Sequence, residues 1–179
     1  MTGAQVAVRT LVGLGVRTLF GIPGVHTLDL YDALLDAPGL RHVLARHEQG
    51  AGFMADGYAR ASGELGVAVT TTGPGVSNIL TALAEAYASS VPVLLLASQI
   101  ESVAIGRGHG ALHEYPDQLA LLRAVSGFAA RADRPETIAP TILDAVRRLR
   151  LGRPRPACIE IPHDVLAAEL PAAAPGDVA

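Results

Sequence analysis

Apolar residues recur along the chain in two alternating patterns, one with the period of a helix and one typical of a buried strand. Apolar or aromatic side chains stand at residues 76, 79, 80, 83 and 87, which places them on one face of a helix. Residues 93–97 are apolar at every position, as in a strand that is covered on both faces. Residues 67–71 are rich in β-branched side chains, which also favours a strand.

The same alternation continues from one end of the chain to the other. Strands separated by helices predict right-handed crossovers and therefore a parallel sheet. We expect an α/β fold with three layers (α/β/α) and a mostly parallel sheet of about six strands. Residues 99–112 have no clear period and contain three glycines, so we expect a loop there. The expected helices are residues 5–14, 28–35, 48–61, 76–88, 117–123 and 135–149, and the expected strands are residues 18–22, 41–45, 67–71, 93–97, 127–131 and 158–161.

The length predicts one domain, because 179 residues of which half are hydrophobic can bury a genuine core. We place this domain at residues 1–169 and interpret residues 170–179, which are rich in Pro and Ala, as a linker or disordered tail. The longest strongly apolar run, residues 91–97, is far shorter than the roughly 20 residues that span a bilayer. Arg9 and Arg17 interrupt any signal-like segment, so we expect a cytoplasmic protein without a membrane span.

Charge and composition exclude several kinds of chemistry. All fourteen basic residues are Arg, against seventeen acidic ones, so lysine Schiff bases and P-loop lysines are ruled out. The single cysteine, Cys158, excludes an internal disulfide framework and a cysteine-rich zinc site. The arginines are scattered along the sequence rather than gathered in a basic stripe, so nucleic-acid binding is not expected.

Three expected strand-to-helix turns carry the candidate chemistry, since ligands bind at the carboxyl ends of strands in open parallel sheets. The first, G-I-P-G-V at residues 21–25, contains two glycines that let the backbone come close to a ligand. The third, residues 70–78, reads T-T-T-G-P-G-V-S-N and superficially suggests a phosphate cradle. It fits neither the dinucleotide fingerprint nor the Walker pattern. An ordinary turn remains an alternative for the first segment.

The second turn places a carboxylate, Glu48, after a strand and at the start of a helix built of Gly, Ala and apolar residues. The helix dipole alone favours an acid there. In an apolar setting, however, the carboxyl group must be paired or its proton affinity must rise. His47 and His113 are more typical of surface or capping histidines than of catalysts. No second His follows His47 at metal-binding spacing, so no metal site is expected. These residues alone predict a cofactor-binding α/β domain.

Taken together, the three turns resemble a known domain. F-G-I-P-G at residues 20–24, H-E-Q-G-A-G-F-M-A-D-G-Y-A-R at residues 47–60 and T-G-P-G-V-S-N at residues 72–78 resemble the pyrimidine-binding (PYR) domain of thiamine diphosphate-dependent enzymes. The similarity runs over residues 2–170 and is greatest to the acetolactate synthase, benzoylformate decarboxylase and 2-oxo acid decarboxylase branch. Residues 108–118, G-H-G-A-L-H-E-Y-P-D-Q, resemble the 5-guanidino-2-oxopentanoate decarboxylase type.

The resemblance implies a role for each of several residues. In the family, the glutamate that matches Glu48 hydrogen-bonds N1′ of the cofactor's aminopyrimidine and so promotes formation of an ylide at C2. This ylide attacks the 2-oxo acid substrate. A glutamate kept protonated in an apolar niche would suit this task. His113 occupies a place near the substrate where relatives often have Gln, and could move protons. The implied pyrimidine contacts are Ile22, Pro23, Gly24, Pro74 and Asn78.

One departure from the family is large. Its members bind the diphosphate through Mg²⁺ on a second domain with a Gly-Asp-Gly motif, which this sequence lacks. The central domain of the branch, which in some members holds FAD, is also absent. We therefore expect the N-terminal domain of a carboxy-lyase or acetolactate synthase-type transferase that is inactive alone. Its partner would be a diphosphate-binding domain of the same or another chain, in a homodimer or larger oligomer.

Two other interpretations stay open. The chain could be a stand-alone α subunit of a split 2-oxo acid decarboxylase, or a non-catalytic binding or dimerisation module that kept the fold. In each case we expect the helices at residues 48–61 and 76–88, rich in Ala and Gly, to form the face that meets a partner domain.

Overall fold

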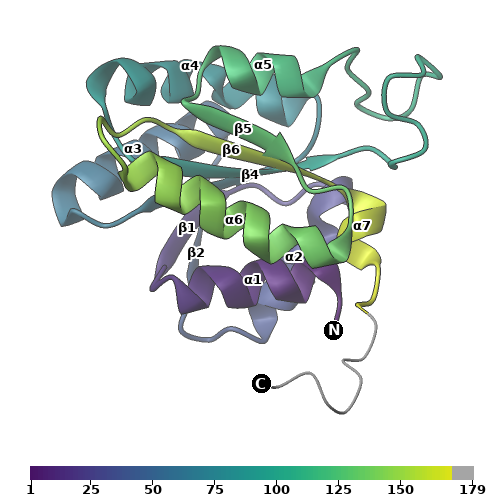
Figure 1. The fold of residues 1–179 in the computed structure, drawn as a ribbon, viewed down its shortest axis with the longest axis horizontal. Helices are drawn as coiled ribbons and strands as arrows, with labels where there is room; N and C mark the ends of the chain where they lie inside the picture. The colour runs from purple at the N-terminus through teal and green to yellow at the C-terminus, as the bar shows by residue number, and fades with distance from the viewer. Residues whose placement is uncertain (171–179) are drawn as a thin grey trace.

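The computed structural model describes residues 1–170, which form one six-stranded sheet with helices on both faces (Figure 1). All neighbouring strands are parallel, and their order across the sheet is β2-β1-β3-β4-β6-β5. This confirms the predicted fold class. The strands are β1 Thr18–Gly21, β2 Arg41–Leu44, β3 Gly66–Thr70, β4 Val93–Gln99, β5 Phe128–Arg131 and β6 Ala157–Pro162.

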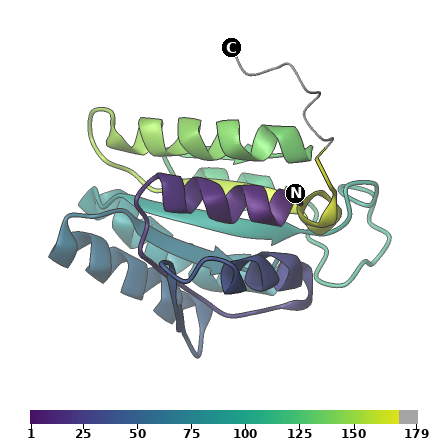
Figure 2. The ribbon, with the colours of Figure 1, turned by 90° about the horizontal axis from the view of Figure 1, so that it is seen from below.

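The helices form two layers, one on each face of the sheet, and Figure 2 looks onto the layer that contains α1 and α6. α1, α2, α6 and α7 pack on one face, and α3, α4 and α5 pack on the other. The helices are α1 Gly3–Gly13, α2 Leu28–Leu35, α3 Glu48–Ser62, α4 Pro74–Ser89, α5 Gln118–Ala124, α6 Pro135–Arg150 and α7 His163–Ala167, with a 3₁₀ turn, η1, at Val25–Thr27.

The central strands are buried on both faces because each face is covered by its own helix layer. Every residue of β3, β4 and β6 is buried. Alternate residues serve alternate layers: Val67 and Val69 face the layer of α1 and α6, whereas Ala68 faces the layer of α3 and α4. The edge strand β2, in contrast, is only half-buried. The apolar runs seen in the sequence are therefore the core of the sheet.

Three local features differ from the expectation. η1 and α7 are too short for a periodic pattern and were not predicted. α4 begins at Pro74 instead of residue 76, because proline suits the first helical position, where its missing N–H costs nothing. β4 continues through Ser98 and Gln99, which the expected strand left out. These two polar side chains are buried and hydrogen-bonded, so polarity did not mark the end of the strand.

The end of the described chain lies beside its beginning. The Leu170 N–H donates to the Met1 carbonyl at 2.9 Å, and the Leu170 side chain packs on the core. The rest of the predicted tail, residues 171–179, lies outside the described residues. Over residues 1–170, no helix is long and apolar enough to cross a membrane.

Cys158 on β6 is fully buried, and burial raises the pKa of its thiol to about 12. The thiolate is the reactive form, so burial makes this thiol unreactive at pH 8 both by hiding it and by raising its pKa. We expect the native chain to leave a disulfide reagent such as DTNB unreacted at pH 8, and the guanidinium-denatured chain to release one equivalent of thiol. Rapid stoichiometric reaction of the native chain would show that β6 is accessible.

Candidate active site

The order of the strands brings the three predicted turns together. β1 has β2 on one side and β3 on the other, so the chain reverses direction across the sheet at β1. Such a switch point leaves a crevice outside the carboxyl ends of the strands. The turn that follows β1 ends at Gly24, the turn that follows β2 ends at Glu48, and the turn that follows β3 ends at Pro74.

Glu48 is the first residue of α3 and pairs with a side chain from α4. The Asn78 side-chain amide donates from Nδ2 to Glu48 Oε2 at 2.9 Å, while His47 caps the helix by accepting the Gln49 N–H. Both Glu48 and Asn78 are half-buried. The sequence left open whether Glu48 would be paired or would bind its proton more tightly, and the structure supplies a partner. His47 has the capping role that is common for such a histidine.

Thr71 lies between two of the predicted glycines. A Cβ atom on Gly24 would lie 2.6 Å from the Thr71 Cβ, and one on Gly75 would lie 3.0 Å from the Thr71 Cγ2 and 3.7 Å from Glu48 Oε1. The first and third turns are therefore packed too closely for a side chain at Gly24. Thr71 Oγ1 is buried and has no hydrogen-bond partner in the described chain, so the third turn contains an unsatisfied polar group.

The other predicted contact residues contribute shape rather than hydrogen bonds. Ile22 is half-buried and packs against the core beneath α3 and α4, whereas Pro23 is exposed. Pro74 is exposed at the start of α4. Together with the half-buried Glu48, these apolar residues give the turns an open, mixed surface. Such an open surface can cover only one side of a ligand, so it suits a ligand whose other side is covered by another domain.

His113 reaches the third turn from the loop that joins β4 to α5. A Cβ atom on Gly73 would overlap the His113 carbonyl oxygen, so the two backbones are in direct contact. His113 itself has a φ of +64°. Its ring lies 5.8 Å from that of the buried His26, which in turn lies 5.3 Å from His163. The structure thus brings His113 to Gly73.

The protonation of His26 is affected by burial and by the two histidines near it. Burial lowers the pKa of His26, and the neighbouring His163 and His113 lower it further. His26 Nδ1 and His113 Nδ1 are both buried without a hydrogen-bond partner among residues 1–170. A neutral His26 beside His113 is the expected state near neutral pH. Neither His26 nor His163 was predicted from the sequence as a site residue.

Glu114, also missed by the sequence analysis, organises the loop that carries His113. Its carboxylate accepts hydrogen bonds from the N–H groups of Gly108, Gly110 and Ala111 at 2.7–3.0 Å. Burial opposes ionisation of this carboxyl, but the backbone N–H groups outweigh it and hold the pKa of Glu114 below its ordinary value. Nearby, the Tyr115 hydroxyl donates to Ser77 Oγ on α4 at 3.1 Å.

The lowered pKa of Glu114 predicts a loop that loosens in acid. A carboxyl whose folded-state pKa is depressed stabilises the fold above its unfolded-state pKa, and this is lost as the pH falls through the folded value. We expect the Gly108, Gly110 and Ala111 amides to lose hydrogen-exchange protection as the pH falls below the ordinary pKa of a glutamate side chain, and Glu114→Gln to remove that pH dependence. Glu101→Gln, at an exposed carboxyl in the same loop, should not. A loss of protection in acid that is as large in Glu114→Gln as in the wild type would contradict this assignment.

Comparison with known proteins decides the family. A family model described as "Thiamine pyrophosphate enzyme, N-terminal TPP binding domain" matches residues 1–121. The chain belongs to this family. As a thiamine pyrophosphate-binding N-terminal domain, it has the parallel α/β fold that the resemblance implied, and the described residues place the three resembling segments at one edge of its sheet.

Curated relatives of this thiamine pyrophosphate-binding domain fall in the expected branch. The chain is 53% identical over 168 residues to the "Probable 2-ketoarginine decarboxylase AruI" of Pseudomonas aeruginosa, covering 94% of this chain and 30% of that protein. It is 40% identical over 166 residues to the "Acetolactate synthase isozyme 3 large subunit" of Escherichia coli, covering 93% of this chain and 28% of that protein. The "Probable acetolactate synthase large subunit" of Methanocaldococcus jannaschii is 42% identical over 170 residues, which cover 95% of this chain and 28% of that protein. The chain thus spans less than a third of each relative.

Proposed function

We propose that the edge formed by the three turns binds the aminopyrimidine half of thiamine diphosphate. The observation that carries this proposal is the Glu48–Asn78 pair, together with the buried, unsatisfied Thr71 Oγ1 where the first and third turns are closely packed. A flat heteroaromatic ring with polar edges fits this mixture of a carboxyl, an amide and apolar surface. The proposed contacts are Ile22, Pro23, Gly24, Glu48, Pro74 and Asn78.

Glu48 is the residue to which we assign the chemical step on this domain. Asn78 occupies one carboxyl oxygen, Oε2, and so fixes the direction in which the other, Oε1, is presented. Oε1 then holds or moves a proton at the ring nitrogen N1′. Thiamine diphosphate, when bound, supplies an electron sink for the carbon–carbon bond that breaks in a 2-oxo acid. A half-buried carboxyl is suited to proton exchange because it is held in place yet reachable.

His113 is proposed as a second catalytic residue, which moves a proton close to the substrate. Its support is positional: the backbone contact with Gly73 holds it beside the turn that opens α4. The neighbouring Glu114 also holds this loop in place, because its carboxylate accepts the Gly110 and Ala111 N–H groups. An imidazole can both accept and donate a proton through its ring nitrogens, as this role requires.

We further propose that a diphosphate-binding domain completes this site and holds the Mg²⁺. Among residues 1–170, no group of three or more His, Cys, Asp or Glu side chains could hold a metal ion. The relatives are more than three times as long as the aligned region, which supports additional domains in the proteins they represent. The reaction would then be that of a 2-oxo acid decarboxylase or of an acetolactate synthase-type enzyme in the cytoplasm.

The second domain could come from the same chain or from another. Exposed apolar side chains on the layer beside the site, Phe53 and Met54 on α3 and Tyr87 on α4, support docking of a partner and a homodimer or larger oligomer. A separate subunit that carries the diphosphate site is the alternative arrangement. A non-catalytic dimerisation module is the alternative function, in which the Glu48–Asn78 hydrogen bond would only join α3 to α4.

Titration of the ¹⁵N-labelled chain with thiamine diphosphate and Mg²⁺, followed by NMR, tests the proposal because it detects even millimolar affinity. We expect shifts confined to the three turns, with Gly24, Gly75 and Asn78 among them. Thiamine without the diphosphate should shift the same residues. The absence of site-specific shifts with either ligand would favour the non-catalytic module. Activity on 2-oxo acids after a diphosphate-binding domain is added would support the two catalytic arrangements and exclude the non-catalytic module.

A further inference from the structure

The inward-pointing amide of Gly73 is held by a side chain from a different part of the chain. Gly73 has a φ of +63° and a ψ of −111°, outside the conformations of ordinary helix caps. Its N–H donates to Gln118 Oε1 at 2.8 Å, and the Thr72 hydroxyl lies 2.8 Å from the same oxygen. Gln118 is the first residue of α5 and is buried. The Gln118 Oε1 atom therefore holds the start of this turn in place.

The other end of the same amide is equally constrained. Gln118 Nε2 donates to the Ser98 carbonyl and to Glu160 Oε2, at 3.0 Å each. A backbone N–H can only donate and a carboxylate can only accept, so a carboxamide is suited to linking them. Neither an apolar side chain nor an ionised carboxylate could satisfy both neighbours.

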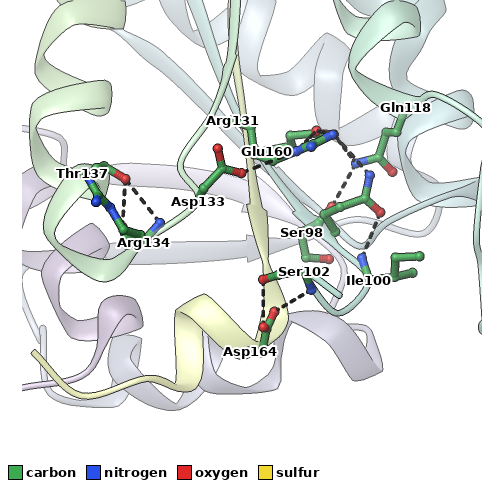
Figure 3. Close-up of polar contacts among 11 residues, drawn as sticks. Ser98, Ile100, Ser102, Gln118, Arg131, Asp133, Arg134, Thr137, Glu160 and Asp164 are labelled. Atoms are coloured by element: carbon green, nitrogen blue, oxygen red, sulfur yellow. Dashed lines mark hydrogen bonds and ion pairs between the residues drawn. The ribbon is translucent and has the colours of Figure 1, made fainter. Parts of the chain in front are cut away.

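Glu160 supplies a fixed charge behind Gln118. It is completely buried in β6, and Arg131 of β5 donates to its Oε1 from Nε and Nη2 at 2.6 Å each (Figure 3). Gln99 Nε2 donates to Oε2 at 3.3 Å. A buried carboxylate needs such pairing to stay ionised. The charge that orients the Gln118 amide is thus held in place on both oxygens.

We propose that Gln118 is a positioning residue for the Gly73–Pro74 turn, and that Glu160 positions Gln118. Gln118 acts through the Gly73 amide and has no contact with the proposed pyrimidine site itself. The inference rests on the proposed function, because cofactor binding is what requires the start of α4 to be held rigid. Through this chain of contacts, β5, β6 and α5 fix one wall of a site whose other residues follow β1, β2 and β3.

Hydrogen exchange at the Gly73 amide tests the contact directly and needs no cofactor. In Gln118→Met, we expect exchange protection at Gly73 to fall at least tenfold more than protection at Leu95, a core amide on β4 that reports global opening. Gln5→Met is the matched control, because Gln5 makes a comparable side-chain bond to the backbone of Thr2, at the start of α1. It should lower Gly73 and Leu95 protection by the same factor. Equal losses at the two amides in Gln118→Met would overturn the proposal.

A second variant gives a readout that loss of packing alone would not produce. In Gln118→Glu, a protonated carboxyl can still donate to Glu160, whereas a second ionised carboxylate would repel it. We expect the protection factor at Gly73 to be high in acid and to fall at least tenfold as the carboxyl pair loses its shared proton at higher pH. In the wild type it should not change over that range. A pH-independent protection factor in Gln118→Glu would contradict the proposal, even if Gln118→Met failed to fold.

The thiamine diphosphate titration tests the consequence of this contact for cofactor binding. In Gln118→Met, we expect at least a tenfold rise in the ligand concentration needed to shift Gly75, whereas Gln5→Met should match the wild type. Unchanged affinity in Gln118→Met would overturn the positioning role. Absence of shifts in the wild type would instead overturn the proposed function, while the exchange result at Gly73 would still report on the Gln118 contact.

Discussion

Replacing Glu48 with glutamine is expected to lower turnover by the proposed enzyme about a thousandfold while the domain stays folded. Glutamine keeps the size of the side chain and can still accept the hydrogen bond from Asn78 Nδ2. It cannot exchange a proton with a ring nitrogen at neutral pH, and proton transfer by a positioned side chain contributes about 10²–10⁴-fold to a rate. The measurement is steady-state decarboxylation of a 2-oxo acid by the assembled protein, with thiamine diphosphate and Mg²⁺ at saturation.

Glu136→Gln is the matched control for this experiment. Glu136 also stands in the first turn of a helix, α6, where the helix dipole favours an acid, but it is exposed and lies in the other helix layer. Each substitution should change the free energy of unfolding by no more than about 1 kcal/mol, because that is the usual value of such a charge. Only Glu48→Gln should lose activity. Activity within threefold of the wild type would leave Glu48 only its favourable charge at the start of α3.

The part of the site that follows strand ends could be predicted because its information is local. The glycines of the first and third turns and the acid that opens α3 each stand next to a strand with a clear apolar pattern. Parallel pairing then brings such turns to one edge of the sheet without any further information. The pairing of Glu48 with Asn78 was one of two outcomes that the composition of α3 left open. Only the packing of α3 against α4 decided between them.

The support beneath the site could not be predicted in the same way. Gln118 bonds to a residue 45 positions away, and Glu160 to one 42 positions away, so no short window contains either pair. The one local signal was Glu160, an acid within an otherwise apolar strand. An acid in a strand covered on both faces requires a partner. That reasoning would have identified a buried pair but not Arg131 as its cation, since the neighbour in the sheet depends on strand order.

Replacing Gly73 with alanine is expected to be the most destabilising single change at the site. Gly73 has a positive φ, which costs any residue with a Cβ about 1–3 kcal/mol. The new Cβ would also overlap the His113 carbonyl oxygen, a backbone atom that cannot move without shifting the loop around Glu114. We expect urea unfolding to show a loss of about 2–4 kcal/mol, within the range of substitutions that combine strain with overpacking.

Gly13→Ala separates this local effect from the general consequence of removing a glycine. Gly13 lies in the last turn of α1, and in the described chain no atom beyond its own helix lies within 4 Å of the position that a Cβ would take. This substitution should therefore gain up to about 1 kcal/mol from the higher helix propensity of alanine. The two substitutions add the same methyl group, so their opposite signs would isolate the contact between Gly73 and His113. If Gly73→Ala were as stable as the wild type, the loop would have to leave the turn without cost. The assignment of His113 to the site would then lose the backbone contact that holds it beside Gly73.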